Sequence, residues 1–199
     1  RDTTVRSLCK NLMFTDHGAW ISALACTDDG TWCASGTKDG NIILRLLAEG
    51  QKYSLQHAST GLIGLFFLGS DESRELVGVS EDGKLRIWNV ASGQIIYDHK
   101  VSPRLSTAAC ERGGDRIYLQ NGNEVFEFVA EDREVFKPLS LGAAGGYANH
   151  TRCIATGSMD GKEYLFAAYE DLSVRVWDIR KKCVIARLRG HDYPVRALV

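Results

Sequence analysis

The sequence of 199 residues predicts an all-β protein built from consecutive hairpins. Its apolar residues do not recur with the 3.6-residue period of an amphipathic helix over windows of helical length. Short apolar or alternating runs are instead separated by turns rich in glycine, aspartate and asparagine. Histidines also recur at regular intervals, which indicates that the hairpins belong to a repeat.

The first hairpins show how each element is assigned. Turns are expected at 28–30 and 38–40, which both contain an Asp-Gly pair. These residues tolerate the positive φ angles of tight hairpin turns. The apolar and alternating runs around the turns predict strands at 20–26, 32–35, 42–47 and 51–56.

The same arrangement returns along the chain. His17, His57 and His99 are separated by 40 and 42 residues, and His150 and His191 by 41. Three units then have a tight turn with an aspartate, at Asp39, Asp82 and Asp171. Strands of similar sequence follow these turns, at 41–46, 84–89 and 173–178. A further strand closes each unit, and four strands in about 40 residues indicate the blades of a β-propeller.

The last complete unit resembles a repeat of the WD40 family. It contains both signature pairs of that family, Trp-Asp at 177–178 and Gly-His at 190–191. The second unit differs by Asn89 after its tryptophan, and the first has Arg45 in place of the tryptophan. The third unit is the most degenerate, because 125–128 reads Val-Phe-Glu-Phe. The resemblance covers nearly the whole chain and implies a WD40-type β-propeller.

The expected organisation is one propeller domain with four complete blades and a partial blade at each end. Residues 1–16 correspond to the end of a preceding blade, and 191–199 to the first strand of a following one. The complete blades are expected at 17–56, 57–98, 99–149 and 150–190, and the third is degenerate with a long loop. Propellers close with about 4–8 blades, and WD40 chains typically use seven. The sequence is therefore expected to be an arc of a longer propeller.

The resemblance implies that repeated polar residues fasten each blade internally. In the family pattern a histidine, the turn aspartate, a strand hydroxyl and the tryptophan indole form a hydrogen-bonded chain. A buried indole N–H without an acceptor costs about 1 kcal/mol or more. Because the spacing is repeated, we interpret these residues as structural rather than catalytic. They are His17, Ser35, Asp39, His57, Ser80, Asp82, Trp88, His150, Asp171, Trp177 and His191. In the first unit, Arg45 either pairs with Asp39 or faces solvent.

Composition excludes several classes of function. The chain has 24 Lys and Arg against 25 Asp and Glu, and a formal charge of −1 provides no general attraction to nucleic acids or anionic membranes. The longest apolar run, around 62–68, is far shorter than the roughly 18–20 residues that cross a bilayer. No charged segment followed by an apolar one opens the sequence, so neither a signal peptide nor a membrane partner is expected.

The cysteines and the missing motifs limit the chemistry further. Six scattered cysteines without CxxC pairs are typical neither of a disulfide scaffold nor of a zinc site. We interpret them as small buried hydrophobic residues in a reducing compartment, which predicts an intracellular location, cytoplasmic or nuclear. No nucleotide-binding, hydrolase, zinc-protease or calcium-binding motif occurs. The sequence therefore predicts no enzyme activity, no cofactor and no metal site.

The family resemblance also implies a partner-binding face. Residues just before the turn aspartates and those that lead into the first strands lie on the face most used for binding in this family. They are Trp20, Lys38, Glu81, Arg104, Arg152, Glu170 and Tyr193. Aromatic and arginine side chains are typical binding anchors, so we expect most from Trp20, Arg104 and Tyr193. The alternative for Trp20 is that it caps the apolar core of its blade.

The predicted function is a non-catalytic scaffold that docks partner proteins within a multiprotein complex. An alternative is an RNA-associated scaffold in a ribosome-assembly or RNA-processing complex. Its support is the basic run Arg180, Lys181 and Lys182, for which a solvated surface is the simpler interpretation and contact with an acidic partner or an RNA backbone the more specific one. A second alternative, an enzyme with a pocket on a propeller face, has no catalytic group to support it once the structural residues are set aside.

Overall fold

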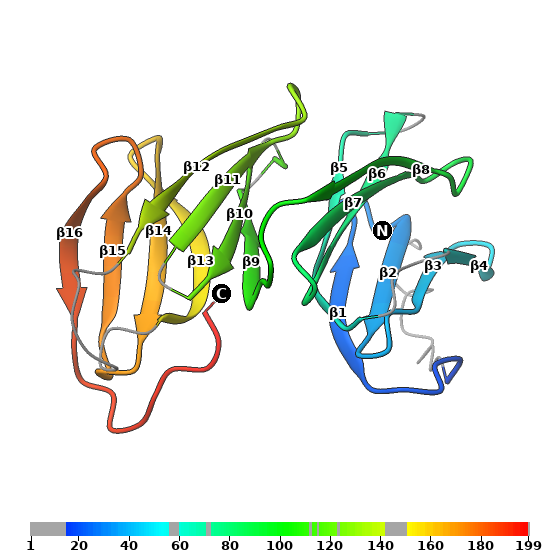
Figure 1. Cartoon of the computed structure of the whole chain (residues 1–199). Coiled ribbons are helices and arrows are strands. Elements are labelled where there is room, and N and C mark those ends of the chain that lie inside the picture. The colour runs from blue at the N-terminus through cyan, green and yellow to red at the C-terminus, as the bar shows by residue number, and fades with distance from the viewer. Residues whose placement is uncertain are drawn as a thin grey trace, which may run out of the picture.

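The computed structural model describes residues 15–55, 60–70, 73–111, 113–114, 116–122, 124–141 and 151–198. These residues form four antiparallel sheets of four strands each, one after another along the chain (Figure 1). Within each sheet the spatial order of the strands follows the sequence. This arrangement confirms the prediction of an all-β chain made of four-stranded blades.

Each sheet begins with its innermost strand and proceeds outward. The first contains β1 (Ile21–Cys26), β2 (Trp32–Thr37), β3 (Ile42–Leu46) and β4 (Gln51–Leu55). The second contains β5 (Leu62–Leu68), β6 (Glu75–Ser80), β7 (Lys84–Asn89) and β8 (Ile95–Lys100). The third contains β9 (Thr107–Cys110), β10 (Arg116–Asn121), β11 (Glu124–Val129) and β12 (Glu134–Ser140). The fourth contains β13 (Thr151–Met159), β14 (Lys162–Tyr169), β15 (Val174–Asp178) and β16 (Cys183–Leu188).

The first strands of the sheets contact one another in chain order. Contacts join β1 to β5, β5 to β9 and β9 to β13, as expected for blades arranged around an axis. We call the end of the molecule at which these four strands begin the amino face, and the opposite end the carboxyl face. In Figure 1, β1 runs upward from the amino face. Because neighbouring strands are antiparallel, the turn between the second and third strands of each sheet also lies at the amino face.

The hydrophobic core lies between neighbouring sheets. Leu44 of the first sheet and Trp88 of the second are fully buried in one cluster. Glycine is required at position 78, beside the indole, because a Cβ there would lie 2.8 Å from the Trp88 ring. Fully burying a leucine side chain such as that of Leu44 contributes about 1.5–3 kcal/mol to the stability of the fold. Middle strands such as β6 and β7 are buried along most of their length, because their two faces pack into the clusters on either side of the second sheet.

The degenerate third unit forms a complete sheet without a tryptophan. Ile117 lies opposite Phe128 in the pairing of β10 with β11, and both are fully buried. Together with Leu119 they fill the cluster between the second and third sheets. Apolar residues with the two-residue period of a strand thus replace the signature residue.

The ends of the expected organisation differ from the middle. Residues 1–14 and 142–150 lie outside the described residues, and with them most of the preceding blade and the long loop expected in the third unit. A following strand is expected at 191–199, and within the described residues 191–198 no strand is present. Val195 and Leu198 instead pack against the buried Ala168 of the fourth sheet. The blade boundaries stay predictions, although β8 continues to Lys100, beyond the expected end at 98.

Two further findings concern the cysteines and membranes. The interpretation of the cysteines as buried residues is wrong for Cys26 and Cys183, which are exposed, whereas Cys153 is buried. Cys183 is exposed because it begins β16, the outermost strand of the fourth sheet. In the part of the chain that the structure describes, no helix has the length and apolar character needed to span a membrane.

Candidate partner-binding faces

The polar network of the first sheet is only partly the one expected. His17 Nε2 and Ser35 Oγ form a hydrogen bond of 2.6 Å. Asp39 does not join them, because it accepts hydrogen bonds from the Thr37 hydroxyl and the Asn41 amide within its own turn.

Arg45 follows neither of the two expected alternatives. Its guanidinium pairs with Asp16, the residue just before His17, and only 9% of its side chain is exposed. Lys52 Nζ lies 2.8 Å from the same carboxylate. A buried cation requires a carboxylate partner, and Asp16 lies close enough to provide one. The arginine thus replaces the buried indole of the second and fourth sheets with an ion pair.

In the second sheet the turn aspartate again bonds to its own turn. Ser80 Oγ donates to Asp82 Oδ1 at 2.6 Å, and the Lys84 amide donates to the same oxygen at 3.3 Å. Gly78 lies four residues before the aspartate, as Ser35 does in the first sheet, and has no hydroxyl. Trp88 is fully buried beside it, and its expected partner His57 lies outside the described residues.

The fourth sheet concentrates several donors on its turn aspartate. Asp171 accepts hydrogen bonds from the Ser173 hydroxyl and from Arg187, and Arg175 Nη2 lies 2.9 Å from its Oδ2. Burial alone would raise the pKa of Asp171, but the hydrogen bonds from Ser173 and Arg175 outweigh it and lower the pKa to about 2. Trp177 is buried, and His191 is exposed. His150 lies outside the described residues.

A pH dependence follows from this turn. The pKa of Asp171 is lower in the folded chain than its ordinary value of 3.8, so its stabilisation is complete above about pH 4 and declines toward pH 2. Urea unfolding of wild type and Asp171→Asn should give a difference in unfolding free energy that shrinks as the pH falls through this window. A difference that stays constant across the window would contradict the role assigned to the carboxylate.

All seven residues predicted to bind partners lie at the amino face. Trp20 precedes β1, and its carbonyl accepts a hydrogen bond of 3.0 Å from the amide of Lys38 in the β2–β3 turn. The side chain of Trp20 is 81% exposed, so it does not cap the core of its blade. Tyr193, which follows β16, is 82% exposed.

At the amino face a backbone hydrogen bond joins the second sheet to the segment that leads into the third. Glu81 in the β6–β7 turn donates its amide to Gly61 O at 2.9 Å and accepts from the Leu105 amide at 3.3 Å. Arg104 is exposed and directly precedes Leu105, whose backbone is held by this hydrogen bond to Glu81. At the fourth sheet, Arg152 and Glu170 form an ion pair of 2.9 Å.

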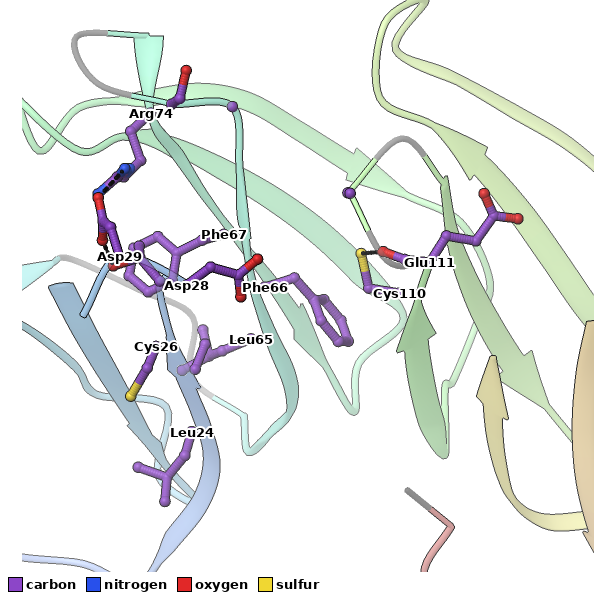
Figure 2. Close-up of a pocket in the computed structure, with 16 residues that line it drawn as sticks. Leu24, Cys26, Asp28, Asp29, Leu65, Phe66, Phe67, Arg74, Cys110 and Glu111 are labelled. Atoms are coloured by element: carbon purple, nitrogen blue, oxygen red, sulfur yellow. Dashed lines mark hydrogen bonds and ion pairs between the residues drawn. The ribbon is translucent and has the colours of Figure 1, made fainter. Parts of the chain in front are cut away.

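The carboxyl face contains a groove that sequence reasoning missed. Its volume is about 950 Å³, and it lies where β1, β5 and β9 end (Figure 2). Phe66 points toward the strand that carries Cys110, and Asp28 contributes a carboxylate to the lining. The groove was missed because its walls come from three sheets, and no local motif marks such a meeting.

Ion pairs between sheets support this face. Arg74 Nη2 of the second sheet lies 2.8 Å from Asp29 Oδ2 of the first (Figure 2). Hydrogen bonds from Thr27 and then Arg74 hold the pKa of Asp29 well below its ordinary range. On the other side, Arg133 of the third sheet donates to Glu75 of the second at 2.6 Å. The second sheet is thus tied to both of its neighbours near the groove.

The basic run lies at the same carboxyl face. Arg180, Lys181 and Lys182 form the exposed turn between β15 and β16. Lys181 Nζ lies 3.7 Å from the Asp178 carboxylate, and its side chain is 73% exposed. The two surfaces expected to bind partners therefore lie at opposite ends of the molecule. Among the described residues, no group of three or more His, Cys, Asp or Glu side chains is placed to hold a metal ion.

Comparisons with protein families and solved structures agree with this architecture. The family model "WD domain, G-beta repeat" matches residues 7–44. The solved structure of U3-55K superposes with a TM-score of 0.74 at 20% identity, covering 91% of this chain and 55% of that one. The crystal structure of RRP9 WD40 repeats gives a TM-score of 0.73 at 20% identity over 91% of this chain and 54% of that one.

Curated relatives include ribosomal proteins. The Small ribosomal subunit protein RACK1z of Arabidopsis thaliana is 32% identical over 82% of this chain, and RACK1 of Glycine max is 30% identical over the same share. The WD repeat-containing protein 26 homolog of Arabidopsis thaliana is 24% identical over 80% of the chain. The chain spans 40% of the length of the two RACK1 proteins and 26% of the third. With its signature pairs, its four sheets and these relatives, the chain belongs to the WD40-repeat β-propeller family, whose members are typically non-catalytic.

Proposed function

We propose that this protein is a non-catalytic scaffold that docks partner proteins through its amino face. The observation that carries the proposal is Trp20, an aromatic side chain that is 81% exposed yet fixed to the Lys38 turn through its backbone. Aromatic side chains of this kind act as binding anchors because they bury a large area on contact.

The surroundings of Trp20 also suit a docking surface. The bond from Leu105 to Glu81 joins the second sheet to the segment that leads into β9, and the bond from Lys38 to Trp20 fixes the turn of the first sheet, so partners meet a preformed surface. A rigid surface loses little conformational entropy on binding. Exposed Lys38 provides a cation next to Trp20, and the same face carries exposed Arg104 before the third sheet and exposed Tyr193 after the fourth.

Affinity purification with quantitative mass spectrometry tests this function. Trp20→Ala should lose the bound partner, since truncating an aromatic anchor costs about 2 kcal/mol or more, which is more than a tenfold loss of affinity. The matched control is Phe136→Ala, which removes an aromatic side chain that is 43% exposed on β12. Equal recovery of partners with Trp20→Ala and wild type would contradict docking through Trp20.

A second candidate function is association with a ribosomal or RNA-containing complex. Two observations favour it: relatives that are named small ribosomal subunit proteins, and the exposed basic turn formed by Arg180, Lys181 and Lys182. Both fit an intracellular location, cytoplasmic or nuclear. Contact with an RNA backbone would occur at the carboxyl face, which leaves the amino face available for protein partners.

Salt-titrated RNA binding tests this second function. Lys181→Glu combined with Lys182→Glu should weaken RNA binding and reduce the slope of log K against log salt by about 1 for each phosphate that the variant no longer binds. The control, Lys38→Glu combined with Lys100→Glu, makes the same change in charge at the amino face. Equal weakening by both pairs would indicate a general charge effect and would contradict a site at the basic turn.

A further inference from the structure

Two cysteines face each other across the first hairpin. Cys26 at the end of β1 and Cys33 on β2 are direct partners in the strand register. The next pair, Thr27 and Trp32, is joined by a hydrogen bond of 3.0 Å from the Thr27 amide to the Trp32 carbonyl. Hydrogen-bonded and non-hydrogen-bonded pairs alternate along an antiparallel ladder, so the cysteines occupy a non-hydrogen-bonded pair.

This position brings the two thiols within bonding range. The Cα atoms of a non-hydrogen-bonded pair lie about 4.5 Å apart, and a disulfide requires roughly 4.4–6.8 Å. The two thiols also interact directly: burial first, and then the hydrogen bond with Cys26, raise the pKa of Cys33 to about 11. Both cysteines are free thiols in this structure.

The two thiols differ in accessibility. Cys26 is exposed, whereas Cys33 is half-buried. An exposed thiol meets an oxidant first, and Cys33, directly opposite in the strand register, is the thiol placed to react second. The pair therefore has an attacking thiol and a resolving thiol.

We propose that Cys26 and Cys33 form a redox-responsive pair that oxidises to a cross-strand disulfide with a small-molecule disulfide such as oxidised glutathione. The Cys26 thiolate attacks one sulfur of the oxidant, forming a mixed disulfide and releasing one glutathione thiolate. The Cys33 thiolate then attacks the Cys26 sulfur, forming the protein disulfide and releasing the second glutathione thiolate. Two protein thiols lose two electrons and two protons, and the glutathione disulfide is reduced to two thiols.

The disulfide fastens one wall of the carboxyl-face groove. The turn between the two cysteines carries Asp28 and Asp29, which line the groove, and Asp29 is paired with Arg74 of the second sheet (Figure 2). Oxidation therefore cross-links the hairpin at the base of this turn. In a reducing compartment such disulfides are transient and serve in redox sensing.

The test uses the full 199-residue chain after reduction and subsequent incubation with oxidised glutathione. Free thiols are blocked with iodoacetamide, and trypsin, which cleaves after Lys10 and Lys38, releases peptide 11–38 with Cys26 and Cys33 as its only cysteines. The disulfide form of this peptide carries no alkyl group and has lost two hydrogen atoms. Cleavage before Asp28 then yields two fragments that stay joined until a reductant is added.

Two controls distinguish the pair from ordinary thiols. Cys33→Ser should stop the reaction at a glutathione mixed disulfide on Cys26. Cys183 is also exposed but lies opposite Asp178, so it should carry only glutathione. A wild-type peptide 11–38 that carries two alkyl groups, retains glutathione, or is linked to another chain would overturn the proposal.

Discussion

Replacing Gly83, in the turn between β6 and β7, with alanine is expected to cause a large loss of stability. Gly83 has a φ of 86°, and an added Cβ would lie 2.7 Å from the backbone carbonyl carbon of Ser102 and closer still to its oxygen. The neighbouring backbone has no freedom to move aside, because the Val101 amide donates to Gly83 O at 2.9 Å. We expect a loss of about 3 kcal/mol or more in unfolding free energy, measured by urea unfolding.

Gly30→Ala provides the matched control. Gly30 also has a positive φ, 67°, but an added Cβ would meet no heavy atom within 4 Å. Its replacement introduces only the backbone strain of a left-handed residue, about 1–2 kcal/mol. Equal losses for the two variants would show that the close approach of Ser102 to Gly83 contributes nothing to stability.

Trp88→Ala is the second change with a large expected effect. Trp88 is fully buried between the first and second sheets and packs against Gly78. Removing a buried indole loses its transfer free energy and leaves a cavity, which together cost about 3–5 kcal/mol. The loss should appear as a lower urea midpoint with an unchanged slope.

Trp20→Ala is the control for this second prediction. Its side chain is 81% exposed, so its removal should change the unfolding free energy by less than about 0.5 kcal/mol. The two variants thus separate stability from docking, because Trp20 is proposed to bind partners. A small loss for Trp88→Ala would mean that the first two sheets do not depend on their shared core.

The strands were predictable because turn chemistry and alternation act locally. The turns at Asp39 and Asp82 carry glycines with positive φ, as the Asp-Gly pairs indicate. Even the third sheet followed from its alternating apolar residues, with Phe128 in the core. Side chains two residues apart point to the same face of a strand, so local sequence determines which residues are buried.

The polar partners were less predictable, because they depend on register. Ser80 is expected to have the same role in the second unit as Ser35 has in the first. The Ser80 hydroxyl instead bonds to the turn aspartate Asp82, whereas Ser35 bonds to His17. The position that corresponds to Ser35 is occupied by Gly78. A shift of two residues along a strand keeps the face but changes which neighbour a hydroxyl can reach. Arg45 likewise pairs with Asp16, which lies outside its own hairpin.

The sequence by itself determined the fold class and the four-stranded repeat, because both depend on turns and periods within about 40 residues, and the family resemblance named the residues that lie at the amino face. Only the tertiary structure decided what lies at the carboxyl face. Asp29 and Arg74 meet there from different sheets, and the groove beside them is formed by the ends of three inner strands. The strand register was also needed to show that Cys26 and Cys33 face each other. Contacts between segments far apart in sequence leave no local pattern, so they become visible only after the chain has folded.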